Sequence, residues 1–346
     1  MKALHCLSYG EPPELRIVET VEPAPGPGEA LIAVEAVGIG GFDAVLLGGR
    51  YQERPEPPFV PGRELAGRVL AVGEGGDPAL IGMRVAAISF KGALAERAVA
   101  RCDHCLATPP DMDPATAASI LSAYATSLYA LETCGRMTAG ETVLVLGGAG
   151  TVGAAAIDIA RGLGGRVVAA ASTTEKLEFC RSRGAELAVD YGDPHWRRAM
   201  TERLGGGIDL VVDPVGGTLS EPAFRSLAPG GRHLVVGFAA GEIPRIPLNL
   251  PLLKRASIVG VDWGGFMQTE PAANRALLDR LRDLFDSGTL RPVQPTVHPL
   301  SALIPLLDGF RNRRIVGKPV IQPDFGTAAS ARSIGKQQCG AGHERD

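Results

Sequence analysis

The sequence predicts a two-domain α/β protein, and three observations support this fold class. The chain has 346 residues, more than the roughly 100 to 150 residues of a typical single domain, so two domains are expected. The first third reads as short apolar segments between turn residues. From Thr142 onward, apolar strands alternate with amphipathic helices, a rhythm typical of a doubly wound parallel sheet covered by helices.

Residues 1 to about 115 are predicted to be mainly β-structure. Runs of proline and glycine at 23–28 and of proline at 55–58 separate the apolar segments, because both residue types fix turn dihedrals and interrupt strand ladders. The strands expected between these turns cover residues 3–7, 15–21, 30–37, 65–72, 84–88 and 94–99.

The second part is predicted to alternate strands and helices. The expected strands are 143–146, 166–170, 187–189, 210–213, 233–236, 257–261, 293–297 and 318–321, and the expected helices are 152–163, 175–183 and 272–287. Residues 114–131 are apolar enough to suggest a membrane span, but their many hydroxyl groups favour a buried helix pair.

These elements suggest the domain limits. We expect one domain over 1–118, completed by 290–323, and a second over 119–289. Residues 324–346 are rich in Gly, Ala, Ser and Gln without apolar periodicity, so we expect a disordered tail.

Composition excludes several classes of function. Lys and Arg number 35 against 38 Asp and Glu, a net charge of −3, which attracts neither nucleic acid nor an acidic membrane surface. Six cysteines are too few for a disulfide scaffold in a chain of this length and suggest a reducing compartment. With no signal peptide visible before the first strand, we expect a soluble, cytoplasmic protein.

The strongest local motif is a glycine-rich turn between the strand at 143–146 and the following helix. Gly148, Gly150 and Gly153 form G-x-G-x-x-G, in which glycine permits a tight turn, close approach of a pyrophosphate and close helix packing. Thr151 and Val152 would then present backbone N–H groups to the anion at the helix N-terminus. The motif predicts a dinucleotide-binding Rossmann domain; the alternative is a glycine turn that serves packing only.

The tip of the next strand indicates which dinucleotide is bound. An NAD-binding domain usually carries Asp or Glu there to hold the ribose 2′-hydroxyl. Here Ser172 and two threonines precede Lys176, with no carboxylate at the tip, and such donors and positive charge suit a 2′-phosphate. We therefore expect NADPH rather than NADH, unless Lys176 is only a solvated surface charge.

With these residues in view, the chain resembles the zinc-independent quinone oxidoreductase branch of the medium-chain dehydrogenase/reductase superfamily over residues 1 to about 323. The matching stretches, besides the Gly148 turn, are 25–29, 49–51, 58–62, 124–126, 213–217, 237–238, 261–264 and 317–318. The resemblance implies a GroES-like β domain and an inserted Rossmann domain, with the nicotinamide in the cleft between them.

The resemblance also implies roles for single residues. Lys176 and Tyr191 match positions that bind the 2′-phosphate, and Thr126 matches one near the nicotinamide. Phe238 and Trp263 fall in segments that border the cofactor, although ordinary core packing explains them equally well. Lys318, in the last matching stretch, is a further cofactor-binding candidate, and Tyr51 matches a position near the substrate.

No metal is expected. Zinc-dependent relatives supply Cys and His where this chain has Gly40 and Arg63, and neither residue can ligate zinc. Cys102 and Cys105 have C-x-x-C spacing, but a structural zinc site needs four ligands and no second pair follows nearby.

Without a Lewis acid, an acceptor that takes hydride unaided is favoured. We expect an NADPH-dependent quinone reductase, with the proton supplied by Tyr51 or water. The alternatives are an enone or enoyl-thioester reductase and a non-catalytic, crystallin-like NADPH-binding protein.

The substrate pocket is expected to include Gly40, Gly41 and Arg63. The two glycines have no side chain to donate a hydrogen bond, so the pocket would be roomier and less polar than the resemblance alone suggests. Arg63 would either meet an anionic oxygen or pair with Glu64 or Asp43. The expected partners are a small-molecule electron acceptor and a second copy of the chain, since the apolar strand at 257–261 would lie at an edge of the sheet.

Overall fold

A computed structural model describes residues 1–325 and divides them into two compact units. Unit 1 comprises Met1–Cys105, Thr296–Ile315 and the described residues from Pro319 onward. Unit 2 comprises Leu106–Pro295 together with Val316–Lys318. One unit is built on an antiparallel sheet and the other on a parallel sheet, which confirms the predicted fold class.

The unit limits differ slightly from the limits suggested by the sequence. Unit 1 ends at Cys105 and unit 2 begins at Leu106, so this boundary lies before the expected one at residue 118. At the other end, Phe325 is buried in the core of unit 1 and its carbonyl accepts a hydrogen bond from Lys2 Nζ at 2.6 Å. The packed chain therefore extends past residue 323; the rest of the expected tail, 326–346, lies outside the described residues.

Unit 1 contains a seven-stranded sheet and a separate two-stranded hairpin. The strand order is β14-β15-β3-β4-β5-β7, with β6 also paired to β3 and with β1 and β2 forming the hairpin. The C-terminal return joins this sheet because β15 pairs antiparallel with β3. The strands are β1 Lys2–Ser8, β2 Glu14–Glu19, β3 Glu29–Gly38, β4 Glu64–Val72, β5 Arg84–Ile88, β6 Arg97–Arg101, β7 Cys105–Ala107, β14 Thr296–His298 and β15 Pro319–Ile321.

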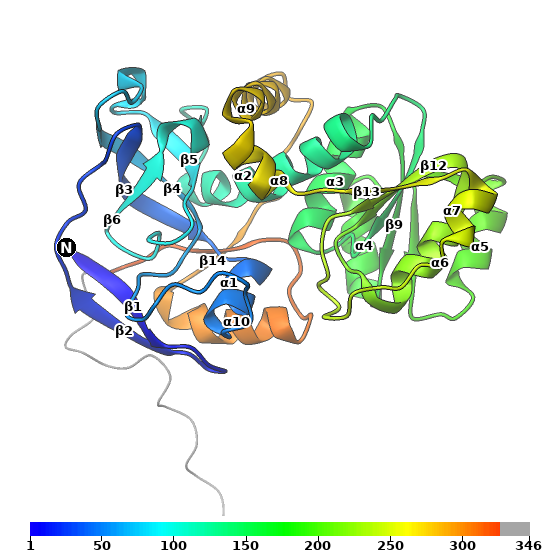
Figure 1. The fold of residues 1–346 in the computed structure, drawn as a ribbon, viewed down its shortest axis with the longest axis horizontal. Coiled ribbons are helices and arrows are strands. Elements are labelled where there is room, and N and C mark those ends of the chain that lie inside the picture. The colour runs from blue at the N-terminus through cyan, green and yellow to red at the C-terminus, as the bar shows by residue number, and fades with distance from the viewer. Residues whose placement is uncertain (326–346) are drawn as a thin grey trace, which may run out of the picture. The chain divides into compact units, whose positions relative to one another are not determined.

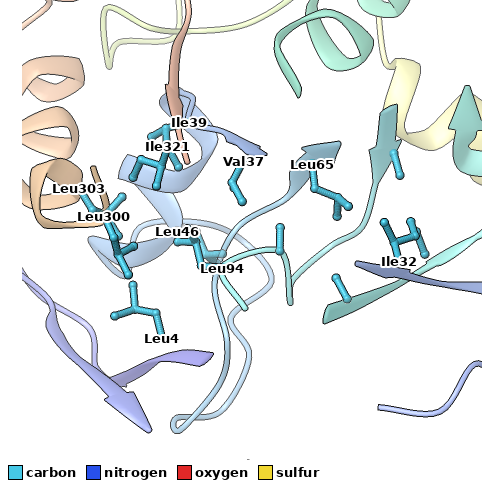
Figure 2. Packing of buried hydrophobic residues seen from close by; sticks show 14 of the residues in the cluster. Leu4, Ile32, Val37, Ile39, Leu46, Leu65, Leu94, Leu300, Leu303 and Ile321 are labelled. Carbon is cyan, nitrogen blue, oxygen red and sulfur yellow. The ribbon is translucent and has the colours of Figure 1, made fainter. Parts of the chain in front are cut away.

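The helices of unit 1 complete its core. Helices α1 (Gly41–Leu47) and α10 (Leu303–Arg311) pack against each other. Figure 2 shows Leu4 and Leu46 near Leu300 and Leu303, so the first strand, α1 and the C-terminal return share one apolar core. Burying each such side chain stabilises the fold by about 1.5–3 kcal/mol. Short 3₁₀ turns lie at Pro78–Leu80, Cys102–His104 and Leu300–Ala302.

Unit 2 contains a six-stranded parallel sheet in the order β10-β9-β8-β11-β12-β13. The order reverses beside β8, the switch point at which doubly wound sheets bind ligands. The strands are β8 Thr142–Leu146, β9 Arg166–Ala171, β10 Leu187–Asp190, β11 Ile208–Asp213, β12 Leu227–Val235 and β13 Ser257–Gly260.

Helices accompany this sheet, as Figure 1 shows for α3, α4 and α5–α7. They are α2 Pro114–Leu128, α3 Thr151–Gly162, α4 Thr174–Ser182, α5 Trp196–Leu204, α6 Ser220–Arg225, α7 Asn249–Lys254, α8 Trp263–Thr269 and α9 Pro271–Asp286, with a 3₁₀ turn at Gly217–Leu219. The expected helix pair over 114–131 is wrong, because α2 runs directly into a π-helical turn, Tyr129–Cys134. Within the described chain, no helix is both long and apolar enough to cross a membrane.

Candidate functional site

The glycine-rich turn joins β8 to α3 at the switch point of unit 2. Gly150 N donates to Gly147 O at 2.9 Å, and α3 begins at Thr151 with no side chain capping its N-terminus. Because the first N–H groups of a helix have no partner within the helix and its dipole is positive at that end, this turn is suited to an anion.

Steric contacts explain why glycines occupy this turn. A Cβ atom on Gly153 would lie 2.2 Å from Gly147 O, and one on Gly148 would lie 2.9 Å from Cys180 Sγ. The same atom on Gly150 would meet only Gly147 O, at 3.3 Å. The positive φ angle falls on Gly147, so that residue rather than Gly148 makes the tight turn, and Gly148 instead allows close packing.

A segment from the C-terminal part of the chain lies against this turn, which the sequence motif alone did not reveal. Gly317 N donates to Ala149 O at 2.8 Å, and the Thr151 hydroxyl donates to Gly317 O at 3.0 Å. Lys318 follows directly and is buried. Since the Thr151 hydroxyl is engaged by Gly317, the contribution expected of Thr151 to an anion site is its backbone N–H.

The residues expected at the adenosine ribose gather at the ends of two neighbouring strands. Ala171 ends β9 opposite Asp190 at the end of β10, and Tyr191 N donates to Ala171 O at 3.1 Å. Ser172 and Tyr191 follow these two residues directly, and Lys176 lies in the first turn of α4. The structure therefore brings Ser172, Lys176 and Tyr191 to one edge of the sheet.

Asp190 is a carboxylate at this edge that the sequence reasoning missed. Its Oδ1 accepts a hydrogen bond from Gly192 N at 2.8 Å, so it orders the loop that carries Tyr191. The sequence reasoning considered only the tip of β9 and not the strand paired with it.

The remaining cofactor candidates occupy different surroundings. Thr126 is partly exposed on α2, next to Ser127, whose hydroxyl donates to Val152 O at 3.3 Å at the start of α3. Phe238 is 42% exposed, whereas Trp263 is buried and its Nε1 donates to Asn274 Oδ1 at 3.0 Å. Trp263 thus packs in the core of unit 2, and its cofactor role stays a prediction.

A buried carboxylate orders the loop after β11, beside the switch point. Asp213 accepts hydrogen bonds from the Ser220 hydroxyl at 2.5 Å and Gly216 N at 2.8 Å, and His233 Nε2 lies 3.0 Å from its Oδ2. Burial opposes ionisation, but these hydrogen bonds, led by that of His233, hold the pKa of Asp213 below its usual value. The 213–217 motif therefore has a positioning role that its sequence alone did not show.

In unit 1, three aromatic rings and an arginine form what we call the Phe42 cluster: Phe42, Tyr51, Arg63 and Phe90. The ring centroids of Phe42 and Tyr51 are 4.8 Å apart, and Phe90 lies 5.9 Å from Phe42 and 6.3 Å from Tyr51. Cζ of Arg63 lies 4.7 Å from the centroid of Phe42. The cluster thus brings together two sequence-predicted site residues, Tyr51 and Arg63.

The two expected pocket glycines lie at the start of α1, which carries Phe42. Gly40 N donates to Asp43 Oδ2 at 2.9 Å, and a Cβ atom on Gly41 would meet no atom within 4 Å. The expected alternative for Arg63, an ion pair with Glu64 or Asp43, is wrong. Arg63 forms no ion pair with any residue in 1–325, and its Nε is buried without an acceptor.

The donor groups at the positions of the zinc ligands do not fit zinc. Gly40 offers no side chain and Arg63 a permanent cation. No three His, Cys, Asp or Glu side chains in residues 1–325 gather in an arrangement able to hold a metal ion. His104, between Cys102 and Cys105, is largely buried, and burial lowers its pKa.

Comparison with known proteins matches both units. Residues 26–156 match the alcohol dehydrogenase GroES-like domain family, and residues 151–279 match the zinc-binding dehydrogenase family. The chain is 34% identical over 312 residues to quinone oxidoreductase-like protein 2 of Bos taurus, which covers 88% of this chain and 88% of that protein.

Solved structures show the same architecture. The quinone oxidoreductase of Thermus thermophilus, whose structures include its complex with NADPH, has a TM-score of 0.78 at 31% identity over 93% of this chain and 100% of that chain. CurK enoyl reductase shares the fold, with a TM-score of 0.83 at 24% identity over 93% of this chain and 99% of that chain.

Proposed function

The chain belongs to the quinone oxidoreductase-like branch of the medium-chain dehydrogenase/reductase superfamily, and from this premise we propose that it is an NADPH-dependent quinone reductase that uses no metal. The observation that carries the proposal is the uncapped N-terminus of α3 behind the Gly147–Gly153 turn. It offers backbone donors to a pyrophosphate where a doubly wound sheet reverses its strand order.

We assign the cofactor to unit 2. The N–H groups of Thr151 and Val152 would hold the pyrophosphate, and Ser172, Lys176 and Tyr191 would hold the 2′-phosphate. Bound NADPH would supply the hydride, which carries two electrons. The choice of NADPH over NADH is supported by the absence of a carboxylate at the end of β9 and by Lys176 in the first turn of α4.

We assign the electron acceptor to the Phe42 cluster of unit 1. A quinone that accepts a hydride must also gain a proton to become a hydroquinone, while the cofactor leaves as NADP⁺. The Tyr51 hydroxyl lies beside Phe42 and would donate that proton, or would relay a proton from water to the quinone. We expect Tyr51→Phe to lower quinone turnover about 100-fold; unaltered turnover would assign the proton to water alone.

Two measurements test the proposal. The first compares the affinities for NADPH and NADH by titration of the intact chain, and we expect tighter binding of NADPH. The second follows NADPH absorbance with 1,4-benzoquinone and 1,4-naphthoquinone beside crotonyl and acryloyl thioesters. Turnover of the thioesters alone would assign an enoyl reductase, and tight NADPH binding without turnover would assign a non-catalytic protein.

We also propose that the protein is a cytoplasmic homodimer. None of the five cysteines within residues 1–325 is in a disulfide bond, which is typical of a reducing compartment. Strand β13 lies at the edge of the parallel sheet, and large apolar side chains near it are exposed on and around α7. An exposed apolar edge of this kind is usually covered or paired with its twin.

A further inference from the structure

The Phe42 cluster holds a positive charge, that of Arg63, with which no carboxylate in residues 1–325 forms an ion pair. Arg63 forms no ion pair within residues 1–325, and its Nε is buried without a hydrogen-bond acceptor. Arg63 acts electrostatically on His104, and the Asp103 carboxylate beside His104, at 3.7 Å, pairs with Arg101 at 2.6 Å. The charge of Arg63 is therefore available to a ligand.

The surroundings of Arg63 give its guanidinium a cation–π contact but give its Nε no hydrogen-bond acceptor. A guanidinium remains charged at any physiological pH, and a buried donor without an acceptor is unfavourable. The face of Phe42 at 4.7 Å provides a cation–π contact. This contact does not use the hydrogen-bonding capacity of the guanidinium, so its donors can still meet an anion.

The aromatic part of the cluster consists of three mutually contacting rings. Phe42 and Phe90 meet edge to face, as do Phe42 and Tyr51, and none of the three rings is fully buried. Partly exposed rings that already contact one another can add a further planar ring by offset or edge contact. A cation beside such rings is suited to a conjugated molecule with a negative group attached.

We propose that the Phe42 cluster selects planar, conjugated electron acceptors that carry a carboxylate, with the carboxylate held by Arg63 and the conjugated system against Phe42, Tyr51 and Phe90. A carboxylate matches the planar fork of guanidinium donors, which can bind both of its oxygens. The inference rests on the proposed function, since it names the class of acceptor that the reductase would prefer.

Binding without turnover gives the first test. Calorimetry on the full chain compares 2-naphthoate with 2-naphthamide, which share ring and shape but differ in charge. We expect naphthoate to bind at least about tenfold more tightly, as expected for a hydrogen bond to a charged group. Equal affinities would overturn the inference.

Variants show whether Arg63 causes the difference. Arg63→Gln should abolish the preference for naphthoate, and Arg63→Lys should retain part of it through its charge. The matched control is Arg16→Gln on β2, an exposed arginine that pairs with Glu14 at 3.6 Å; it should leave the preference unchanged. Should Arg63→Gln fail to fold by circular dichroism, the wild-type comparison and Arg63→Lys decide.

Turnover separates this inference from the proposed function. The substrates are trans-3-benzoylacrylate and its neutral amide, followed through NADPH absorbance. We expect kcat/KM for the carboxylate to exceed that for the amide at least about tenfold, and Arg63→Gln to remove the excess. Equal or better turnover of the amide overturns the inference and leaves the reductase standing. An Arg63-dependent naphthoate preference without turnover of any acceptor, quinones included, overturns the reductase and keeps the anion site.

Discussion

At the residue scale, the choice between the two pyridine nucleotides depends on a few groups at the ends of β9 and β10. Ser172 and Tyr191 are placed side by side by the pairing of Ala171 with Asp190. Lys176 is the only lysine or arginine in the stretch from Ser172 to Lys176, and it lies in the first turn of α4. The carboxylate of the adjacent Asp190 would repel a 2′-phosphate, so the cation at 176 is the group that favours NADPH.

Lys176→Ala should therefore reduce the preference for NADPH. Loss of one charge-assisted contact to a phosphate costs about 1.5–3 kcal/mol, equivalent to about 10- to 150-fold in affinity for NADPH, with little change for NADH. Fluorescence titration of both nucleotides measures the ratio. Lys91→Ala, an exposed lysine of unit 1, is the control; an unchanged ratio in Lys176→Ala would remove Lys176 from the cofactor site.

At the element scale, a buried network of hydrogen bonds and one ion pair links α2, α3 and the C-terminal end of α4. Asp158 on α3 is fully buried and pairs with Arg183, which follows α4, while the Tyr124 hydroxyl on α2 donates to Asp158 Oδ2 at 2.5 Å. Arg183 Nη2 also donates to Arg291 O at 2.6 Å. Burial raises the pKa of Asp158 despite these partners, so the carboxylate depends on them to stay charged.

Removing the cation from this network should cost far more stability than removing the hydroxyl. Arg183→Met leaves a buried carboxylate unpaired and should lower the free energy of unfolding by about 3–5 kcal/mol. Tyr124→Phe removes one hydrogen bond and should lower it by about 1–2 kcal/mol. Urea unfolding followed by circular dichroism measures both values, and equal effects would show that Arg183 does not neutralise Asp158.

A second ion pair links the loop before β8 to β12. It should make the free energy of unfolding depend on pH. Glu141 accepts two hydrogen bonds from Arg232, at 2.8 and 2.9 Å, and these lower the pKa of Glu141. A carboxyl group with a lowered pKa in the folded state stabilises the fold above its unfolded pKa of about 4.3, and this contribution is lost as the pH falls through the lower folded value.

Glu141→Gln should accordingly destabilise the protein by about 1–2 kcal/mol at pH 7. The difference from wild type should shrink as the pH falls below about 4.3. Urea midpoints between pH 3 and pH 7 give the profile. Glu186→Gln, which breaks an exposed pair with Arg166 at 3.2 Å, should change stability by less than about 1 kcal/mol and serves as the control. A pH-independent difference would contradict the assignment.

The sequence predicted elements well where burial makes their pattern regular. β5 was predicted with its observed bounds, and the helix predicted over 272–287 is α9, Pro271–Asp286. Helix α5 was missed because only Trp196 and Met200 on it are buried, which leaves no apolar period to detect. Helix α1 was missed because it begins inside a glycine-rich stretch, with Gly40 as its N-cap.

The candidate site was predicted in the same uneven way. Local motifs indicated the glycine turn and the absence of a carboxylate after β9. Contacts between distant segments could not be predicted. Nothing in the sequence shows that Gly317 forms a hydrogen bond with Ala149 or that Arg63 lies over the ring of Phe42. Such contacts depend on tertiary packing, which residue patterns do not encode locally.

At the scale of the whole molecule, the exposed edge of unit 2 calls for an explanation. Within the described chain, β13 pairs only with β12, and its Ile258 is 42% exposed. On α7, which precedes β13, Leu252 and Leu253 are 76% and 73% exposed. Unpaired backbone groups beside exposed apolar side chains favour association, and a two-fold pairing of β13 with its twin would satisfy both.

A charge on this edge should separate the two copies. In the homodimer that we propose, Ile258→Lys would place two like charges near the two-fold axis and remove apolar area, so the dimer should dissociate at micromolar concentrations where the wild type remains paired. Light scattering after gel filtration measures the mass. Ile81→Lys, at a position that is 51% exposed after the Pro78–Leu80 turn of unit 1, should leave the mass unchanged. A monomeric wild type, or an Ile258→Lys dimer as tight as the wild type, would show that β13 does not pair with its twin. Dissociation without loss of NADPH affinity would further show that the glycine turn binds NADPH without the second copy. The contacts of Gly147–Gly153 with Gly317 of the same chain imply this result.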